Sequence, residues 1–296
     1  MEPLEPGGPL ALKNILLATD FSPASGVALP QALKIAGQYG SKLYIAYVIC
    51  PELLQFGPQE STMATVQDAR RMAQQNMESL VSAATQRGIQ CEPLIGEGAI
   101  WDVLEDMIRE KSIDLIIVGT HGRGGVGKLL LGSVAEEVFR LAPCPVLTVG
   151  PKTLEMRSRD VELSHILYPL EFLPDPSAAA TYAVSLAEQY HARLTFMKVF
   201  EERVPSSELE AAVEEPARHW MDDHVPIGSD LRKRTRFEPG FGPAADAILK
   251  FAGDHGVDLI VMGVRRLDPV MAAHLPKPDT AYTVVCNAQC PLLTVR

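Results

Sequence analysis

The stretch Ile113–Ser133, IDLIIVGTHGRGGVGKLLLGS, joins a short apolar run to a glycine-rich loop. Its first residues, Ile113–Val118, are apolar except for Asp114, and Leu115–Val118 is the continuous apolar run expected of a strand buried on both faces of a parallel sheet. Apolar residues at helical spacing follow near Val134–Leu141, so the loop leads from a strand into a helix. Backbone N–H groups in such a loop, and at the N-terminus of the helix, can hold an anion. The stretch therefore predicts an α/β fold with a phosphate-binding connection.

Strands and helices also alternate on both sides of this stretch. Ser22-Pro23 is typical of a helix start, because serine caps the first turn and proline fits the first helical position. Gly40 and Gly88 are predicted to end the helices before them. The expected strands are Asn14–Thr19, Lys42–Val48, Cys91–Ile95, Ile113–Val118 and Val146–Val149, and the expected helices are Pro23–Tyr39, Gln59–Arg87, Ala99–Lys111 and Val134–Leu141. This order predicts a doubly wound α/β domain, in which ligands bind outside the carboxyl ends of the strands at a switch in strand order.

The whole pattern occurs twice. KNILLATDFSP, from Lys13, aligns without a gap with SHILYPLEFLP, from Ser164, 151 positions later. The ends of the two copies also match, APCPVLTV (Ala142–Val149) against AQCPLLTV (Ala288–Val295). We therefore expect a flexible tail at residues 1–12, a first domain at 13–151, a linker at 152–162 and a second domain at 163–296.

The composition is that of a globular protein without a basic surface. Apolar residues make up 47% of the 296 residues, charged residues 22%, and the net charge is −10. This acidity argues against binding to nucleic-acid phosphates or to an anionic membrane. No apolar run approaches the ~18–20 residues that cross a bilayer, and five cysteines in so long a chain are not a disulfide framework. The first residues are typical of a tail rather than a signal peptide, so we expect a cytoplasmic protein.

Two short nucleotide motifs in the loop lack their usual context. Gly122–Lys128 fits the Walker A spacing, but Leu129 follows where a serine or threonine should ligate magnesium. Gly122, Gly124 and Gly127 fit the dinucleotide pattern, which belongs in the first strand-to-helix turn of a domain. Because the loop follows the fourth predicted strand, both motifs are weak indications.

The full spacing Gly119-x2-Gly122-x9-Gly132-Ser133 resembles the nucleotide-binding signature of the universal stress protein family. ILLATDFS, with Asp20 after the first strand, is similar to the opening of that family, and PCPVLTV is similar to its closing strand. The resemblance covers nearly the whole chain as two copies. It implies two tandem doubly wound parallel-sheet domains of the Rossmann-like, adenine nucleotide alpha-hydrolase-like type.

The resemblance also implies a ligand, ATP, alone or with Mg²⁺, in the first domain. Carried over position by position, the implied binding residues are Ala18, Thr19, Asp20 and Val48 at the adenine and ribose, Val118, Gly119, His121 and Gly122 at the sugar and first phosphates, and Gly132, Ser133 and Val134 at the outer phosphates. Two of them have structural alternatives. Ser133 and Glu136 have the spacing of a capping box, in which the serine caps its helix. Asp20 could instead hold the turn before Ser22-Pro23 by a hydrogen bond.

The second copy keeps the strand pattern and loses the signature. Pro278-Asp279 stands opposite the Gly132-Ser133 pair, and Glu171 stands opposite Asp20. Proline removes an N–H group, and the aspartate carboxylate would occupy the place of a phosphate at the helix N-terminus. We therefore expect no ATP site of the family type in the second domain.

These features favour a regulatory or interaction protein of the stress response whose first domain holds a nucleotide and recruits an unknown protein partner. Hydrolysis would be slow at most, because no residue near Ser133 is placed as a general base, and we assign neither catalytic residues nor a metal site. The alternatives are a slow ATPase or adenylating enzyme of related fold, and an assembly module that binds no nucleotide. The resemblance also implies that Val146–Val149 and Leu292–Val295 pair within one chain, which would cover two sheet edges, and a homodimer is a further option.

Overall fold

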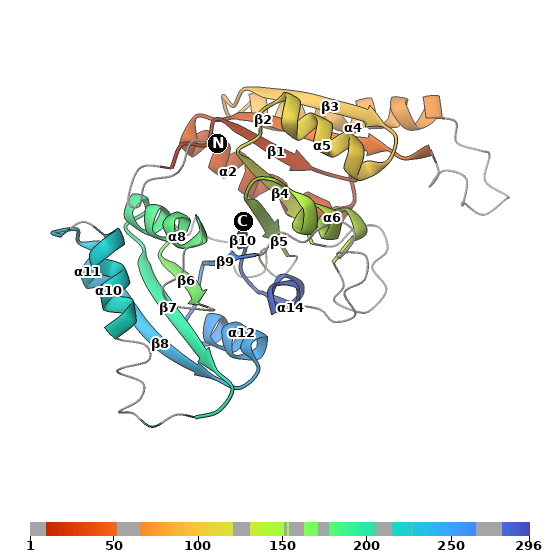
Figure 1. The fold of residues 1–296 in the computed structure, drawn as a ribbon. Coiled ribbons are helices and arrows are strands. Elements are labelled where there is room, and N and C mark those ends of the chain that lie inside the picture. Colours follow the sequence, from red (N-terminus) through yellow and green to blue (C-terminus); the bar gives the residue numbers. More distant parts are fainter. Residues whose placement is uncertain are drawn as a thin grey trace. The chain divides into compact units, whose positions relative to one another are not determined.

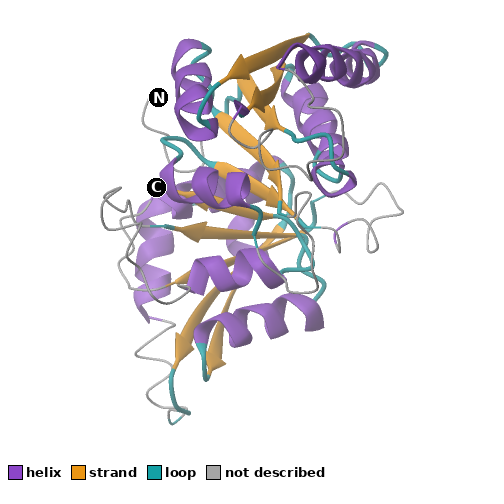
Figure 2. Cartoon of the chain, turned by 90° about the vertical axis from the view of Figure 1, so that its right-hand side faces the viewer, coloured by secondary structure: helices purple, strands orange, loops and turns teal. Residues whose placement is uncertain are grey.

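The structure is a computed structural model that describes residues 10–51, 66–120, 131–150, 153, 163–170, 178–203, 205, 215–225, 227–264 and 280–296. The chain divides into two compact units. Ala11–Val149 forms the first, called the N-terminal unit, and Gly150–Arg296 belongs to the second, the C-terminal unit. In both units helices cover both faces of a sheet (Figure 2).

The described residues of the N-terminal unit include five parallel strands, which Figure 1 labels. They are β1 (Asn14–Ala18), β2 (Lys42–Ile49), β3 (Cys91–Glu97), β4 (Leu115–Gly119) and β5 (Val146–Val149), in the order β3-β2-β1-β4-β5. The chain moves outward from β1 to β3 and then returns to the other side of β1, so the switch in strand order lies between β1 and β4. The helices are α1 (Pro23–Gly26), α2 (Leu29–Tyr39), α4 (Val66–Thr85), α5 (Ile100–Glu110) and α6 (Ser133–Leu141). Since crossovers between parallel strands are right-handed, α2 and α4 cover one face and α5 and α6 the other.

The C-terminal unit repeats this topology. Its parallel strands are β6 (His165–Leu170), β7 (Arg193–Phe200), β8 (Thr235–Phe241), β9 (Leu259–Gly263) and β10 (Leu292–Val295), in the order β8-β7-β6-β9-β10. Its helices are α8 (Ala178–Gln189), α10 (Glu215–His224), α11 (Leu231–Arg234), α12 (Ala244–Asp254) and α14 (Thr280–Asn287). The predicted fold class, two tandem doubly wound parallel-sheet domains, is confirmed.

One predicted helix is wrong. The segment from Pro23 to Tyr39 forms two helices, α1 and α2, separated at Val27 and Ala28. Pro30 has no N–H group and cannot continue the ladder to the carbonyl of Gly26, so the first helix ends. Gly40 ends α2 in the left-handed conformation, at φ 63°, as predicted. The expected start of the long helix at Gln59 lies outside the described residues.

The central strands supply the core of each unit. Ile15, Leu16 and Ile117 are fully buried in the N-terminal unit, as are Ile166 and Ile260 in the C-terminal unit. Burying one such side chain stabilises a fold by ~1.5–3 kcal/mol. The cysteines follow the same pattern, since those at 144, 286 and 290 are buried, and all five are free thiols. Among the described residues no helix combines the length and the apolar character that crossing a membrane requires.

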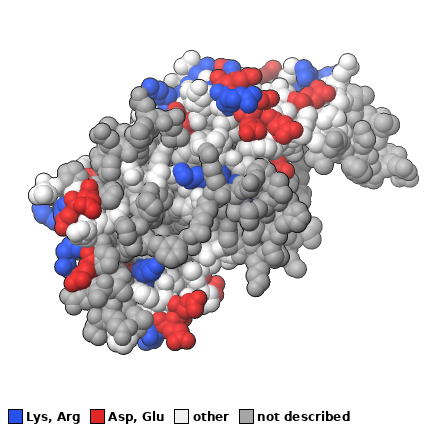
Figure 3. Space-filling model, viewed as in Figure 1, with Lys and Arg blue, Asp and Glu red and all other residues white. Residues whose placement is uncertain are grey.

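Charges of both signs lie next to one another on the surface. Figure 3 shows Lys and Arg side chains interleaved with Asp and Glu side chains on the face in view. A net charge of −10 and this interleaving disfavour a nucleic-acid-binding surface on that face.

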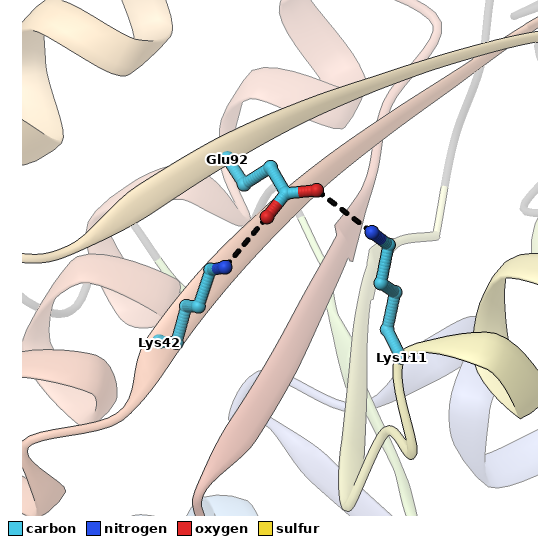
Figure 4. A network of polar contacts seen from close by, with 3 residues as sticks. All are labelled: Lys42, Glu92 and Lys111. Atoms are coloured by element: carbon cyan, nitrogen blue, oxygen red, sulfur yellow. Dashed lines mark hydrogen bonds and ion pairs between the residues drawn. The ribbon is translucent and has the colours of Figure 1, made fainter.

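One charged network joins three elements of the N-terminal unit (Figure 4). Glu92, on β3, accepts hydrogen bonds from Lys42 Nζ on β2 at 2.5 Å and from Lys111 Nζ at the end of α5 at 2.8 Å. Both ammonium groups also lie near the ring of Tyr44, at 4.8 and 5.7 Å from its centroid. The hydrogen bonds from Lys111 and Lys42 hold the pKa of Glu92 below its usual value of 4.5.

Glu92→Gln is expected to lower the stability of the protein slightly at pH 7. A lowered folded-state pKa means that the charged carboxylate stabilises the fold above its ordinary pKa, and that this stabilisation is lost as the pH falls through the lower folded value. The difference between the two proteins should therefore close in acid, where Glu92 itself becomes neutral. Urea unfolding at pH 7 and at pH 3 measures this, and equal midpoints at pH 7 would show that the network adds no stability.

Candidate functional site

Those predicted binding residues of the first two groups that the structure describes lie at the carboxyl edge of the N-terminal sheet. Ala18, the last residue of β1, pairs in register with Ala46 of β2 on one side and with Val118 of β4 on the other. Val48 lies two residues beyond Ala46 on β2, and Gly119 ends β4. This edge is the switch in strand order, where open α/β sheets bind ligands.

A tight turn follows β1 and is held by its own side chains. Thr19 Oγ1 accepts a hydrogen bond from the N–H of Phe21 at 3.0 Å and lies 3.0 Å from Ser25 Oγ. Asp20 Oδ1 accepts from the N–H of Ser22 at 2.9 Å. These bonds hold Phe21 at φ 59°, a conformation that costs a non-glycine residue free energy. The hydrogen bond that the structural alternative for Asp20 predicts is therefore present, through one of the two carboxylate oxygens, and nucleotide binding by Asp20 stays a prediction.

The turn leads into α1 through the predicted cap. Ser22 is the N-cap of α1, its Oγ accepts from the N–H of Ser25 at 3.1 Å, and Pro23 is the first helical residue. Ser25 Oγ in turn donates to the carbonyl of Ser22 at 3.0 Å. Thr19 and Ser25 therefore tie the end of β1 to the first turn of α1.

Gly119 lies where α1 comes closest to β4. A Cβ atom at this position would be 2.7 Å from the carbonyl oxygen of Ala24 and 2.8 Å from Cα of Ser25. Both are backbone atoms, and real Cβ atoms do not come so close. The first glycine of the signature is thus required by the packing of α1 against β4, beside the residues Thr19 and Ser25.

The base of the glycine-rich loop is closed by backbone hydrogen bonds. Thr120 donates its N–H to the carbonyl of Val149 at 3.0 Å, and Gly132 donates to the carbonyl of Thr120 at 2.8 Å. The two ends of the loop therefore lie next to each other at the carboxyl edge. The residues between them, 121–130, are outside the described part of the chain, and they include the predicted His121 and Gly122.

The helix after the loop begins without a side-chain cap. Gly132 is the N-cap of α6, at φ −62° and ψ 149°, and Ser133 is the first helical residue. The capping-box alternative is therefore wrong: Ser133 is not the cap, and Glu136 accepts instead from Arg140 Nε at 3.0 Å. Nothing is described of the Ser133 side chain. The first N–H groups of a helix have no intrahelical partner, and a glycine cap offers them no oxygen from a side chain.

The family model for universal stress proteins matches residues 11–150 and again residues 162–296. The chain belongs to the universal stress protein family. A universal stress protein of Methanocaldococcus jannaschii is 30% identical over 138 residues, which are 46% of this chain and 81% of that protein. A universal stress protein A homologue of Coxiella burnetii is 30% identical over 146 residues, 47% of this chain and 97% of that protein.

Solved structures agree with the tandem arrangement. The crystal structure of a universal stress protein from Archaeoglobus fulgidus has a TM-score of 0.70 and covers 96% of this chain and 98% of its own. Its sequence identity to this chain is 18%, so the likeness is one of fold.

Three residues at this edge of the universal stress protein fold were not predicted. Ser25 bonds Thr19, and the ring of Phe21 packs against that of Tyr47, with centroids 4.6 Å apart. Ser25 had a detectable signal, because it stands three positions after the capping Ser22. The pairing of Phe21 with Tyr47 had none, since the two residues belong to different elements.

The matching edge of the C-terminal unit differs in chemistry. Leu170, buried at the end of β6, stands where the N-terminal unit has Thr19, so it cannot accept the hydrogen bond that holds the turn. The other altered positions of the family signature, Glu171 and Pro278-Asp279, lie outside the described residues. Within the described ranges of both units, no three His, Cys, Asp or Glu side chains come together as a metal site would need.

Proposed function

We propose that the N-terminal unit binds ATP, alone or with Mg²⁺, and that the protein acts in the cytoplasm as a regulatory member of the stress response. The observation that carries this proposal is the meeting of two features at one edge. The switch in strand order brings Ala18 and Val118 together, and the backbone bond from Gly132 to Thr120 holds the start of α6 at the same edge. A nucleotide needs both an apolar surface for its base and N–H groups for its phosphates.

The proposed division of roles follows from the chemistry of each element. Ala18 and Val118, with Val48, are proposed to lie beside the base at the ends of β1, β4 and β2, and Asp20 is proposed to bond the ribose hydroxyls. Gly132 leaves the N-terminus of α6, with Ser133 and Val134, open to an anion, and the helix dipole favours a negative charge there by ~0.3–1 kcal/mol. His121 and Gly122 are proposed to cover the sugar and the first phosphates. No described residue near the edge is placed to activate water, so hydrolysis is proposed to be slow at most.

Gly132→Asp tests this proposal at a position whose backbone conformation suits the new residue. The backbone of Gly132, at φ −62° and ψ 149°, is open to any residue, and aspartate is a favoured N-cap. The variant helix should therefore remain stable, while the new carboxylate takes the place of a phosphate. We expect about one adenine nucleotide to be released per chain when the natively purified protein is denatured, and at least a tenfold lower ATP affinity in the variant, or about 1.4 kcal/mol.

The matched control is Gly253→Asp, which makes the same chemical change on an exposed position of α12 with open space around it. This variant should keep the nucleotide. A wild-type protein that carries no nucleotide and takes up none from millimolar ATP would overturn the proposal and favour an assembly module. A change of the bound ATP into ADP over hours would measure the slow hydrolysis directly.

A further inference from the structure

A buried histidine opens the first strand of the C-terminal unit, at the edge opposite to the family's nucleotide site. His165 is the first residue of β6 and is only 3% exposed. The repeat places it 151 positions after Asn14, the first residue of β1. The N-terminal copy thus has an amide where the C-terminal copy has a titratable ring.

Hydrogen bonds define the protonation state of this ring. Arg193 Nη2, on β7, lies 2.9 Å from His165 Nδ1, and the guanidinium can only donate. Nδ1 therefore accepts and carries no proton. His165 Nε2 lies 2.9 Å from Thr195 Oγ1 and carries the single proton, which it donates to the hydroxyl. The ring is the neutral Nε2–H tautomer.

A hydrogen-bond acceptor also lies close to Nδ1 of the ring. The carbonyl oxygen of His255, at the end of α12, lies 3.3 Å from His165 Nδ1. A carbonyl accepts, so it can bond to Nδ1 only when that atom carries a proton. Nδ1 thus lies between a donor that needs the neutral ring and an acceptor that needs the charged ring.

The other groups around the ring come from each element packed against it. The carboxylate of Asp258, before β9, accepts from the N–H groups of Ser164 and His165, each at 3.0 Å. On α12, Phe251 meets the His165 ring edge-on at 6.4 Å and stacks on the His255 ring at 4.0 Å.

On β8 the residue that pairs with Thr195 is a cation of the same sign as Arg193. Arg236, at the start of that strand, donates to the backbone carbonyls of Lys233 and Thr235. Burial and the charge of Arg193 lower the pKa of His165 below its ordinary value of 6.5, against the opposing effects of the His255 carbonyl and Asp258.

The N-terminal unit has a different side chain at the equivalent position. Asn14 Nδ2 donates to the carbonyl of Ser112 at 3.2 Å and does not titrate near neutral pH. Its neighbour Lys42, which matches Arg193 in the repeat, is neutralised by Glu92. The corresponding position to Glu92 on β8 is Arg236, because each lies one residue beyond the first pair of its strand ladder.

We propose that His165 is a proton-operated switch of the C-terminal unit. In the neutral ring Nδ1 accepts from Arg193, which joins β6 to β7. In the protonated ring Nδ1–H turns to the carbonyl of His255 and the Arg193 guanidinium is expelled, so the amino-terminal edge of this unit loosens in acid. The N-terminal unit, with Asn14, has no such response.

The direction of the response follows from proton linkage. The unfolded chain binds a proton at the ordinary histidine pKa, above the folded value, so the unfolded state holds more protons in the interval between the two. Stability from His165 is therefore complete above pH 6.5 and is lost as the pH falls from 6.5 to the folded pKa.

Each unit contains one of the two tryptophans, so tryptophan fluorescence can distinguish the unfolding of the two units in the full-length protein. Trp101 lies on α5 of the N-terminal unit and Trp220 on α10 of the C-terminal unit. In a Trp101→Phe background, Trp220 fluorescence reports urea unfolding of the C-terminal unit alone. We expect its midpoint to fall from pH 7.5 to pH 5 more than in the same background with His165→Asn, which introduces the residue of the N-terminal copy. His191→Asn, at an exposed position with φ 51°, is the matched histidine control and should leave the pH dependence unchanged.

A second variant tests the switch on the folded protein. Arg193→Met removes the donor and its charge, so the pKa of the His165 ring, followed by its NMR shift, should rise towards the value of the unfolded chain. The pH interval in which stability is lost then narrows, so the Trp220 midpoint should fall less between pH 7.5 and pH 5 than it does with Arg193 in place. The proposal is overturned if the pKa of His165 is unchanged by Arg193→Met, or if His165→Asn leaves the pH dependence of the Trp220 transition as it was.

Discussion

Gly119→Ala is expected to destabilise the N-terminal unit and to weaken nucleotide binding together. The added methyl group would lie 2.7 Å from the carbonyl oxygen of Ala24 and 2.8 Å from Cα of Ser25. Because both atoms belong to the backbone of α1, no rotamer change relieves the clash, and the helix or the end of β4 must move. Overpacking of this kind costs about 1–3 kcal/mol, and more where the backbone cannot yield.

The same movement reaches the proposed binding site. Ser25 is 3.0 Å from Thr19 Oγ1, which holds the turn that presents Asp20. A shift of α1 should therefore disturb this turn, and we expect ATP affinity to fall by at least tenfold, about 1.4 kcal/mol. Chemical unfolding followed by Trp101 fluorescence and ATP titration of the folded variant measure the two effects.

Gly37→Ala is the matched control for this substitution. Gly37 lies inside α2, and a Cβ there would meet only Ile89 Cδ1, at an ordinary 3.9 Å. Alanine in a helix interior is favoured over glycine by roughly 0.5–1 kcal/mol, so this variant should be slightly stabilised and bind ATP normally. If Gly119→Ala matched Gly37→Ala in both measurements, the close approach of α1 to β4 would not be what requires the glycine.

The parts of the fold that could be predicted are those that depend on residues close together in the sequence. The apolar runs around Leu16 and Ile117 are strands because only a sheet buried on both faces needs such runs, and their repetition gave the second unit. The helix break before Pro30 was missed because the apolar spacing continues across it. The alternation of strands and helices predicted a doubly wound parallel sheet, but the order of its strands came only from the structure.

The site could be predicted less completely, because its contacts join distant segments. The spacing of the signature indicated Gly119 as a residue near a ligand, whereas its close neighbours are the backbone of α1. The capping box was wrong because Gly132, not Ser133, is the cap of α6. The polar partners of the His165 ring lie on β7 and at the end of α12, so no local sequence pattern could predict them.

Phe196→Ala is expected to have the largest effect on the C-terminal unit. Phe196, on β7, is 1% exposed, and its ring lies 5.7 Å from that of Tyr168, 5.1 Å from that of Trp220 and 5.2 Å from that of Phe237. Truncating a buried phenylalanine costs ~3–5 kcal/mol, from lost burial and from the cavity that remains. A domain has only about 5–15 kcal/mol of stability in all, so this loss brings the unit close to unfolding.

Trp220 reports this loss directly, because its ring touches the deleted one. The urea midpoint of the Trp220 transition should fall strongly in a Trp101→Phe background, while Phe196→Leu, which keeps most of the volume, should cost far less. Equal midpoints for wild type and Phe196→Ala would contradict the packing of α10 on β7.

Phe196→Ala also tests whether the N-terminal unit can bind ATP when the C-terminal unit is unfolded. The proposed binding residues all belong to Ala11–Val149. A urea concentration can be chosen at which the C-terminal unit is unfolded in Phe196→Ala and folded in the wild type. We expect the variant to bind ATP at this concentration. An unchanged ATP affinity would support a nucleotide site that the N-terminal unit forms without the C-terminal unit. Loss of ATP together with the Trp220 signal would instead mean that the second copy, although its signature has changed, is needed to hold the nucleotide-binding unit in shape.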